Sequence, residues 1–244
     1  MNNIIKELVE RKSVRAFLEK EISLEDKEQI LNAAVNGPSA GNQQMYRIID
    51  VTDKEIKDKL SILCDNQPFI KEGKMLLVFC SDFKKWYDAF KIADLNPREV
   101  GVGDLILGIE DSMIAAQNAI TAAWSLGIGS CYIGDILENK EKIKELLKLP
   151  EYVFPSTLVV FGYPTKQQLE RAKPKRESLK YLVCENVYNN YSDEDLLKMF
   201  IDKQGFNNEE DCKMWLKRFY NRKYNSDFAK EMSRSVNEYL KEYK

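Results

Sequence analysis

The chain has no histidine among its 244 residues. Without an imidazole it cannot form a Ser-His-Asp or Cys-His nucleophile system, and most transition-metal sites lose their commonest ligand. Its five cysteines are an odd number, widely spaced and without a CxxC pair. This pattern indicates reduced thiols rather than a disulfide framework or a zinc site. Any chemistry of this chain must therefore proceed without an imidazole.

Long apolar runs and a basic charge excess are missing as well. No stretch reaches the about 18 consecutive apolar residues that a membrane helix needs. Lys and Arg total 37 against 39 Asp and Glu, so no basic field indicates a nucleic-acid partner. Residues 1–6 lack the charged head and apolar run of a signal peptide. We therefore expect a cytoplasmic protein that binds neither nucleic acid nor a membrane.

Two common phosphate-binding loops are also absent from the sequence. No GxGxxG opens a helix after a predicted strand, and no GxxxxGK[ST] occurs. The remaining anion-binding candidates are two cationic clusters, RKSVR at 11–15 and RAKPKR at 171–176. A phosphate monoester calls for two or three Lys or Arg side chains and a hydroxyl or backbone amide. Taken alone, however, both clusters are better explained as solvated surface.

Hydrophobic periodicity predicts one α+β domain with a helical C-terminal extension. The helix at 104–126 is apolar around most of its circumference, so it is either the central core helix or half of a subunit interface. Ser23 begins another helix in a sequence that resembles a capping box. Further helices are expected at 2–10, 54–63, 84–93 and 140–147 and from about 189 onward. Strands are expected at 46–51, 75–80, 131–135 (a short strand or a turn), 156–162 and 181–184.

A series of short motifs runs across residues 8–190. They are RKSVR at 11–15, PSAGNQQ at 38–44, NQ at 66–67, AQNA at 116–119, LGIG at 126–129, YIG at 132–134, LKLP at 147–150, GYP at 162–164 and LVCENVY at 182–188. Together and in this order, they resemble the flavin-dependent nitroreductase family, specifically its larger oxygen-insensitive nitroreductases and flavin reductases.

The resemblance implies a nitroreductase-like α+β fold, with a central, mostly antiparallel sheet flanked by helices. It implies an FMN-binding domain over residues 1–190 and a helical arm over 191–244 that packs on the same domain or on the partner subunit. It also implies a homodimer with FMN at the subunit interface. NADH or NADPH would give a hydride to flavin N5, and a nitroaromatic, quinone or flavin acceptor would then take the electrons in a ping-pong reaction. A cofactor that carries the chemistry suits a protein without histidine.

The basic motif takes two roles under this resemblance. Arg11 and Ser13 would bind the FMN phosphate, and Lys12 would lie along the ribityl-phosphate arm. Arg15 would lie near N1 and the C2 carbonyl of the ring, where a fixed positive charge stabilises the reduced flavin. No side chain is assigned as a catalytic acid, base or nucleophile, because the reaction takes place at flavin N5.

Other motifs would complete the flavin site. Gln67 would hydrogen-bond to the pyrimidine edge of the ring. Three residues would lie against the ring and offer backbone donors to N5 and O4: Tyr132, Ile133 and Gly134. The other subunit would contribute Ser39, Asn42 and Gln44. The phosphate site would be closed by Arg176 together with Lys175 or Lys173, since the usual Lys-Pro-Arg pattern here reads Lys-Pro-Lys-Arg.

Two other interpretations stay open. The same fold can host different flavin chemistry, such as flavin fragmentation or dehalogenation. The chain could also be a non-catalytic FMN-binding protein whose C-terminal aromatic residues block the flavin. The choice between NADH and NADPH and the physiological acceptor also stay open.

Overall fold

The computed structural model describes residues 2–244, which form two compact units. The first comprises residues 2–171 and 231–244, and the second comprises residues 172–230. The domain boundary that the sequence predicts at residue 190 falls inside the second unit. None of the helices in residues 2–244 has both the length and the apolar character needed to cross a lipid bilayer.

The first unit is built on a four-stranded sheet with the order β1-β2-β4-β3, in which every neighbouring pair is antiparallel. Its strands are β1 (Tyr46–Asp50), β2 (Met75–Asp82), β3 (Gly129–Ile133) and β4 (Val153–Gly162). The antiparallel α+β architecture that the resemblance implies is confirmed.

Burial of strand β2 on both of its faces explains the apolar run in its sequence. Side chains alternate between the two faces of a strand, and all eight residues of β2 are buried. Leu76 and Cys80 face one hydrophobic cluster, whereas Met75 and Phe79 face another. Both faces of the sheet are therefore covered by helices, and this favours the hydrophobic residues found from Met75 to Cys80, before the strand ends in the polar residues Ser81 and Asp82.

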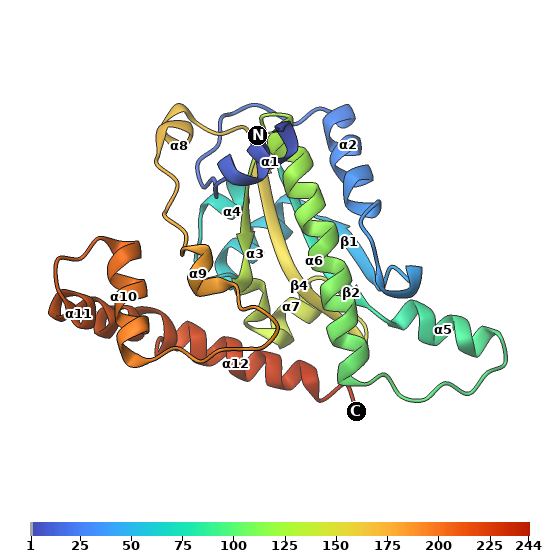
Figure 1. The fold of residues 1–244 in the computed structure, drawn as a ribbon. Coiled ribbons are helices and arrows are strands. Elements are labelled where there is room, and N and C mark those ends of the chain that lie inside the picture. The colour runs from blue at the N-terminus through green and yellow to red at the C-terminus, as the bar shows by residue number, and fades with distance from the viewer. Residues whose placement is uncertain (1) are drawn as a thin grey trace. The chain divides into compact units, whose positions relative to one another are not determined.

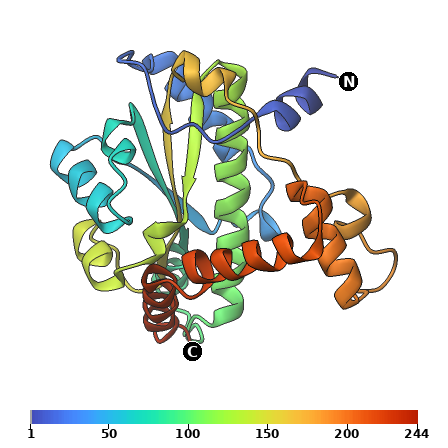
Figure 2. The ribbon, with the colours of Figure 1, turned by 90° about the vertical axis from the view of Figure 1, so that its left-hand side faces the viewer.

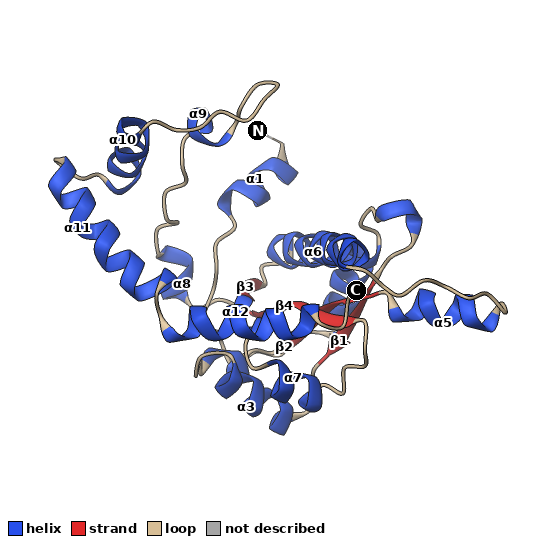
Figure 3. Cartoon of the chain, turned by 90° about the horizontal axis from the view of Figure 1, so that it is seen from below, coloured by secondary structure: helices blue, strands red, loops and turns tan. Residues whose placement is uncertain are grey.

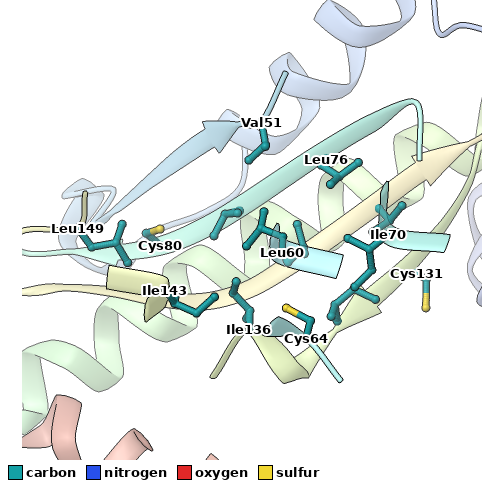
Figure 4. Close-up of a cluster of buried hydrophobic side chains, with 14 of the residues drawn as sticks. Val51, Leu60, Cys64, Ile70, Leu76, Cys80, Cys131, Ile136, Ile143 and Leu149 are labelled. Carbon is teal, nitrogen blue, oxygen red and sulfur yellow. The ribbon is translucent and has the colours of Figure 1, made fainter. Parts of the chain in front are cut away.

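Different helices cover the two faces (Figures 2 and 3). On one side lie α3 (Lys54–Leu63), α4 (Phe69–Glu72) and α7 (Lys140–Leu146), which contribute Leu60, Ile70 and Ile143 to the core (Figure 4). On the other side lie α2 (Leu24–Val35) and the long helix α6 (Val102–Ser125). Helix α6 comes so close to the sheet at Gly108 that an added Cβ would lie 2.2 Å from the Ser81 hydroxyl.

The predicted helices are confirmed to within a few residues, including α1 (Asn3–Glu10), α5 (Lys84–Ile92) and α6. Ser23 caps α2 as expected, because its hydroxyl accepts a 3.0 Å hydrogen bond from the Asp26 N–H. Four short helical segments escaped the sequence prediction, because a single turn carries too little periodicity. These are the 3₁₀ turns η1 (Ala40–Asn42) and η2 (Gly134–Leu137) and the helices α4 and α8 (Lys166–Glu170).

The C-terminal residues from Glu231 onward belong to the first unit. They form most of helix α12 (Asp227–Leu240) and the short tail that follows it. The rings of Tyr239 and Tyr243 are buried in a small cluster with Phe154. Ion pairs from this helix to α7 include Arg234 to Glu141 at 2.9 Å. The end of the chain is therefore fixed by both apolar and charged contacts.

The second unit is helical. It contains α9 (Leu179–Leu182), α10 (Asp193–Gln204), α11 (Glu209–Phe219) and a π-helical turn, η3 (Tyr220–Tyr224). Trp215 packs with Phe200, Phe206 and Phe219, at ring-centroid distances of 5.1 to 6.0 Å. These partly exposed aromatic residues lie beside the few buried residues of this unit, among them Met199 and Cys212.

The strand predicted at 181–184 is wrong. Residues 181 and 182 end helix α9, and residues 183 and 184 are extended or coiled without a strand partner among residues 2–244. A run of four apolar residues cannot distinguish a helix from a strand by periodicity. A strand also needs a neighbouring strand to satisfy its backbone groups, and no strand within residues 2–244 pairs with this segment.

Candidate functional site

The basic motif runs beside strand β3. Ser13 forms a parallel bridge with Ser130, and the Val14 N–H donates a 2.9 Å hydrogen bond to the Ser130 carbonyl. Val14 is fully buried against Gly129, where an added Cβ would lie 2.6 Å from the valine side chain. Because side chains alternate along an extended segment, burying Val14 turns Ser13 and Arg15 to the opposite side.

Helix α8 and the residue after it hold the motif in place. The Arg15 N–H donates to the Gln168 side-chain oxygen at 3.1 Å, and the Arg171 guanidinium donates to the Ser13 carbonyl at 2.8 Å. Lys12 donates to the carbonyls of Leu169 and Arg171. The Lys12 ammonium is thus engaged with α8, and its contact with a ribityl-phosphate arm stays a prediction.

Three guanidinium groups act on the buried side chains of β3. Burial raises the pKa of the Cys131 thiol, while the positive charges of Arg15, Arg11 and Arg171 oppose that rise. Burial likewise raises the pKa of Tyr132 to about 12, again opposed by Arg11. The raised pKa keeps the Cys131 thiol protonated at neutral pH, and the side chain packs in the core. The three arginines therefore form a cationic cluster at β3, and two of them, Arg11 and Arg15, belong to the basic motif.

Arg171 was missed as a partner of the first motif. The sequence placed it in the second cationic cluster, more than 150 residues away, where a solvated surface was the favoured interpretation. Its position depends on how β4 leads into α8, which no local pattern reveals. Basic composition was the only signal that could have pointed to it.

Gln67 lies near the same end of the sheet. Its Nε2 atom donates to the Cys64 carbonyl and to Asp135 Oδ2, both at 2.8 Å. The Arg15 guanidinium lies 6.0 Å from the ring centroid of Phe69, two residues after Gln67. The structure thus brings Arg15, Gln67 and the segment after β3 together.

The segment after β3 is open at one position. A Cβ added to Gly134 would meet no atom within 4 Å. Ile133, in contrast, is buried in the core, so its backbone and not its side chain is available to a ligand. Tyr132 is half-buried, and its hydroxyl donates a 3.4 Å hydrogen bond to Gln117 Oε1.

The loop at 38–44 is organised by a buried carboxylate. Asp111 of α6 is only 2% exposed and accepts hydrogen bonds from the Ala40 N–H at 2.8 Å and the Met45 N–H at 2.9 Å. Asp111 belongs to no motif that marks it in the sequence. The available signal was an acidic residue on a helix that is otherwise apolar around most of its circumference.

The conformation of this loop also depends on its own residues. The Ser39 hydroxyl accepts from the Gln44 N–H at 3.1 Å, and Gly41, Asn42 and Gln44 all have φ near +50°. Asn tolerates this left-handed region, which suits glycine best. The Trp86 indole N–H donates to the Gln43 carbonyl at 2.9 Å, which ties the loop to α5.

The structure does not bring this loop to the basic motif within one chain. The loop is attached to the middle of α6 and to α5, whereas the motif is attached to β3 and α8 (Figure 1). The prediction that Ser39, Asn42 and Gln44 reach the flavin of the other subunit stays a prediction. So does the closure of the phosphate site by Lys175 and Arg176, which are exposed in the second unit.

Comparison with known protein families matches the segments that form this site. The family described as "Nitroreductase family" matches residues 8–163, which include the sheet, the basic motif and the loop at 38–44. The chain belongs to the nitroreductase family. The resemblance that the short motifs indicated is therefore confirmed.

Individual relatives of this nitroreductase-family chain cover most of its length. It is 34% identical over 183 residues to an FMN reductase (NAD(P)H) of Bacillus subtilis, covering 74% of each chain. It is 35% identical over 164 residues to an oxygen-insensitive NADPH nitroreductase of Salmonella typhimurium, covering 67% of each. Among solved structures, an NADPH:FMN oxidoreductase from Vibrio harveyi complexed with NAD+ superposes with a TM-score of 0.82 at 26% identity, covering 98% of both chains.

Proposed function

We propose that this chain is an FMN-dependent oxidoreductase that passes a hydride from NADH or NADPH to the flavin and then reduces a nitroaromatic, quinone or flavin acceptor. The observation that carries the proposal is the cluster of Arg11, Arg15 and Arg171 at β3, in a chain of the nitroreductase family. The relatives named as FMN reductases and nitroreductases support the same reaction class.

The residues present fit the phosphate end of FMN. A phosphate monoester needs two or three cations and a hydroxyl, and Arg11, Arg171 and Ser13 supply this set beside β3. The Ser13 hydroxyl also hydrogen-bonds to the Cys131 thiol, which keeps it on the side where the arginines act. Arg11 and Ser13 would hold the phosphate, and Arg171 would support them through its bond to the Ser13 carbonyl.

The residues also fit the ring of FMN. The bound flavin supplies a hydride acceptor at N5 and a route for electrons to the second substrate. Arg15 is exposed and positively charged, and it would stabilise the negative charge that reduction leaves near N1. Gly134 leaves open space that a flat ring requires, and Gln67 presents an amide nearby.

A second copy of this chain would complete the site. Helix α1 has no buried residue, and its apolar side chains Ile4 and Leu8 are 68% and 47% exposed. On the core helix α6, Ile106 and Leu107 are 50% and 41% exposed. Exposed apolar side chains on adjoining helices are typical of a protein interface. Such a dimer would also give the loop at 38–44 a flavin to contact, namely that of its partner.

Steady-state kinetics test the proposal. Initial rates measured at several concentrations of NAD(P)H and of a nitroaromatic or quinone acceptor should give parallel double-reciprocal lines, because the first product leaves before the acceptor binds. Converging lines would contradict the ping-pong reaction. Loss of flavin absorbance in proportion to turnover would indicate flavin fragmentation, and release of halide would indicate dehalogenation. A bound flavin without turnover would indicate a non-catalytic FMN-binding protein.

A further inference from the structure

The amide of Gln67 is fixed in a single orientation by two acceptors. Its Nε2 atom lies 2.8 Å from the Cys64 carbonyl oxygen and 2.8 Å from Asp135 Oδ2. The backbone is fixed as well, since the Gln67 N–H donates to the Ser61 carbonyl at 2.9 Å and the Ser61 hydroxyl donates to the Gln67 carbonyl at 3.0 Å. Neither the main chain nor the side chain of Gln67 is free to turn.

The chemistry of the two partners assigns the two ends of this amide. A primary amide has two N–H donors on nitrogen and an acceptor oxygen. A peptide carbonyl and a carboxylate only accept, so the reverse orientation would place Gln67 Oε1 against two acceptors. The Cys64 carbonyl and Asp135 therefore use both N–H groups of Gln67.

Only the oxygen of the Gln67 amide is left for a ligand. No donor within residues 2–244 makes a hydrogen bond to Gln67 Oε1. The neighbouring position at Gly134, next to Asp135, is open space, and Arg15 reaches the ring of Phe69 nearby. A molecule that binds in this region meets Gln67 as a hydrogen-bond acceptor and not as a donor.

We infer that Asp135 is a positioning residue, which holds the Gln67 amide so that Oε1 accepts a hydrogen bond from the N3–H of the flavin ring. The pyrimidine part of an oxidised isoalloxazine carries acceptors at N1, O2 and O4, and N3–H is its one donor. The acceptor polarity of Gln67 therefore selects that edge. The inference rests on the proposed function, because it takes the ligand to be FMN.

The buried carboxyl group of Glu138, beside half-buried Asp135, supports this role. Glu138, which is 5% exposed, hydrogen-bonds to Asp135 when it carries a proton. Glu138 also faces the charges of Asp65 and Glu231, which favour its protonated form. Protonated Glu138 donates to Asp135 and so leaves the Asp135 carboxylate as the acceptor that Gln67 requires.

Binding of FMN and of N3-methyl-FMN by the apoprotein tests the inference. Quenching of flavin fluorescence gives both dissociation constants. For the wild-type protein we expect N3-methyl-FMN to bind about tenfold more weakly, which corresponds to one hydrogen bond of about 1.4 kcal/mol. Gln67→Leu should reduce the ratio of the two constants to about one. A wild-type ratio near one would overturn the inference.

Variants of Asp135 test the positioning role separately. Asp135→Ala should reduce the ratio to about threefold or less, because the amide can then turn and offer its N–H groups. Asp135→Asn should keep about tenfold discrimination, since the asparagine carbonyl can accept in place of the carboxylate. Asp65→Asn, which removes a neighbouring negative charge, should also keep it.

Failure of the inference and failure of the proposed function give different results in these measurements. If Asp135→Ala keeps the wild-type ratio, or if Asp135→Asn loses it as fully as the alanine variant, Asp135 does not position Gln67. If Asp135→Ala does not fold, as judged by circular dichroism, Asp135→Ser takes its place in the same comparison, because its side chain is too short to accept from Gln67 as Asp135 does; it should also reduce the ratio to about threefold or less. If the wild-type apoprotein binds neither flavin, the proposed function itself is overturned.

Discussion

Replacing Glu138 by glutamine should stabilise the folded chain in a way that depends on pH. The Glu138 side chain is buried, and its Oε1 atom has no hydrogen-bond partner within residues 2–244. Burial, followed by the charges of Asp135 and Asp65, raises the pKa of Glu138 from 4.5 to about 7. Glutamine has the shape of the protonated acid and can donate to Asp135 as the acid does.

The sign and size of the effect follow from proton linkage. Between pH 4.5 and about 7, folded Glu138 keeps a proton that the unfolded chain releases. The stability of the wild-type fold that this proton provides is present below pH 4.5 and is lost as the pH rises through 7. At about 1.36 kcal/mol per pH unit, the loss is limited to about 0.8 kcal/mol at pH 5 and about 3 kcal/mol at pH 8. We expect about 2 kcal/mol at pH 8, because an ionised side chain can relax towards solvent.

Urea unfolding at pH 5 and pH 8 measures the difference between the variant and the wild type. Glu138→Gln should raise the free energy of unfolding by less than about 1 kcal/mol at pH 5 and by about 2 kcal/mol at pH 8. A gain that is the same at both pH values, or a loss at pH 8, would refute the reasoning, because it would separate the effect from the ionisation of Glu138.

Glu141 supplies a matched control that removes the same charge with the opposite sign of effect. Its ion pair with Arg234 lowers the pKa of this carboxyl to about 2. The stability from this ion pair is therefore present above pH 4.5 and lost as the pH falls towards 2. Glu141→Gln should destabilise the chain slightly at pH 8, because the pair is largely exposed.

Further predictions concern the motif, the loop and their supports. Arg15→Ala should lower the reduction potential of bound flavin, measured by redox titration, more than it weakens FMN binding; an unchanged potential would remove Arg15 from its proposed role. Asp111→Ala should cost about 2 to 4 kcal/mol in urea unfolding, because two backbone N–H groups of the loop at 38–44 lose their acceptor. Gly129→Ala should cost about 1 to 3 kcal/mol by crowding Val14, and should weaken FMN binding in a fluorescence titration; unchanged values would contradict the docking of the basic motif on β3.

Much of the fold could be predicted because its elements carry strong local patterns. The buried runs around Leu76 and Val159 were recognised as strands, and helix α3 begins and ends where its pattern predicts. The segment at 181–184 was predicted wrongly because four apolar residues fit either structure. The short turns η1, η2 and α8 depend on contacts with residues far along the chain, which periodicity does not contain.

The site could be predicted only in part, for a related reason. Arg11 and Gln67 were found through family motifs. Asp135 and Asp111 were missed because each acts on a segment more than 60 residues away, through hydrogen bonds that exist only in the folded chain. Asp111 is buried and Asp135 is half-buried, and removal from water makes a carboxylate costly unless it has donors. That cost was the one physical signal of their importance.

The visible spectrum of the purified protein under anaerobic conditions tests the central claim most directly. The proposed function predicts a yellow protein with the absorption bands of bound FMN, and these bands should bleach when NADH or NADPH is added. A colourless protein that does not take up FMN, or a bound flavin that neither nucleotide bleaches, would contradict it.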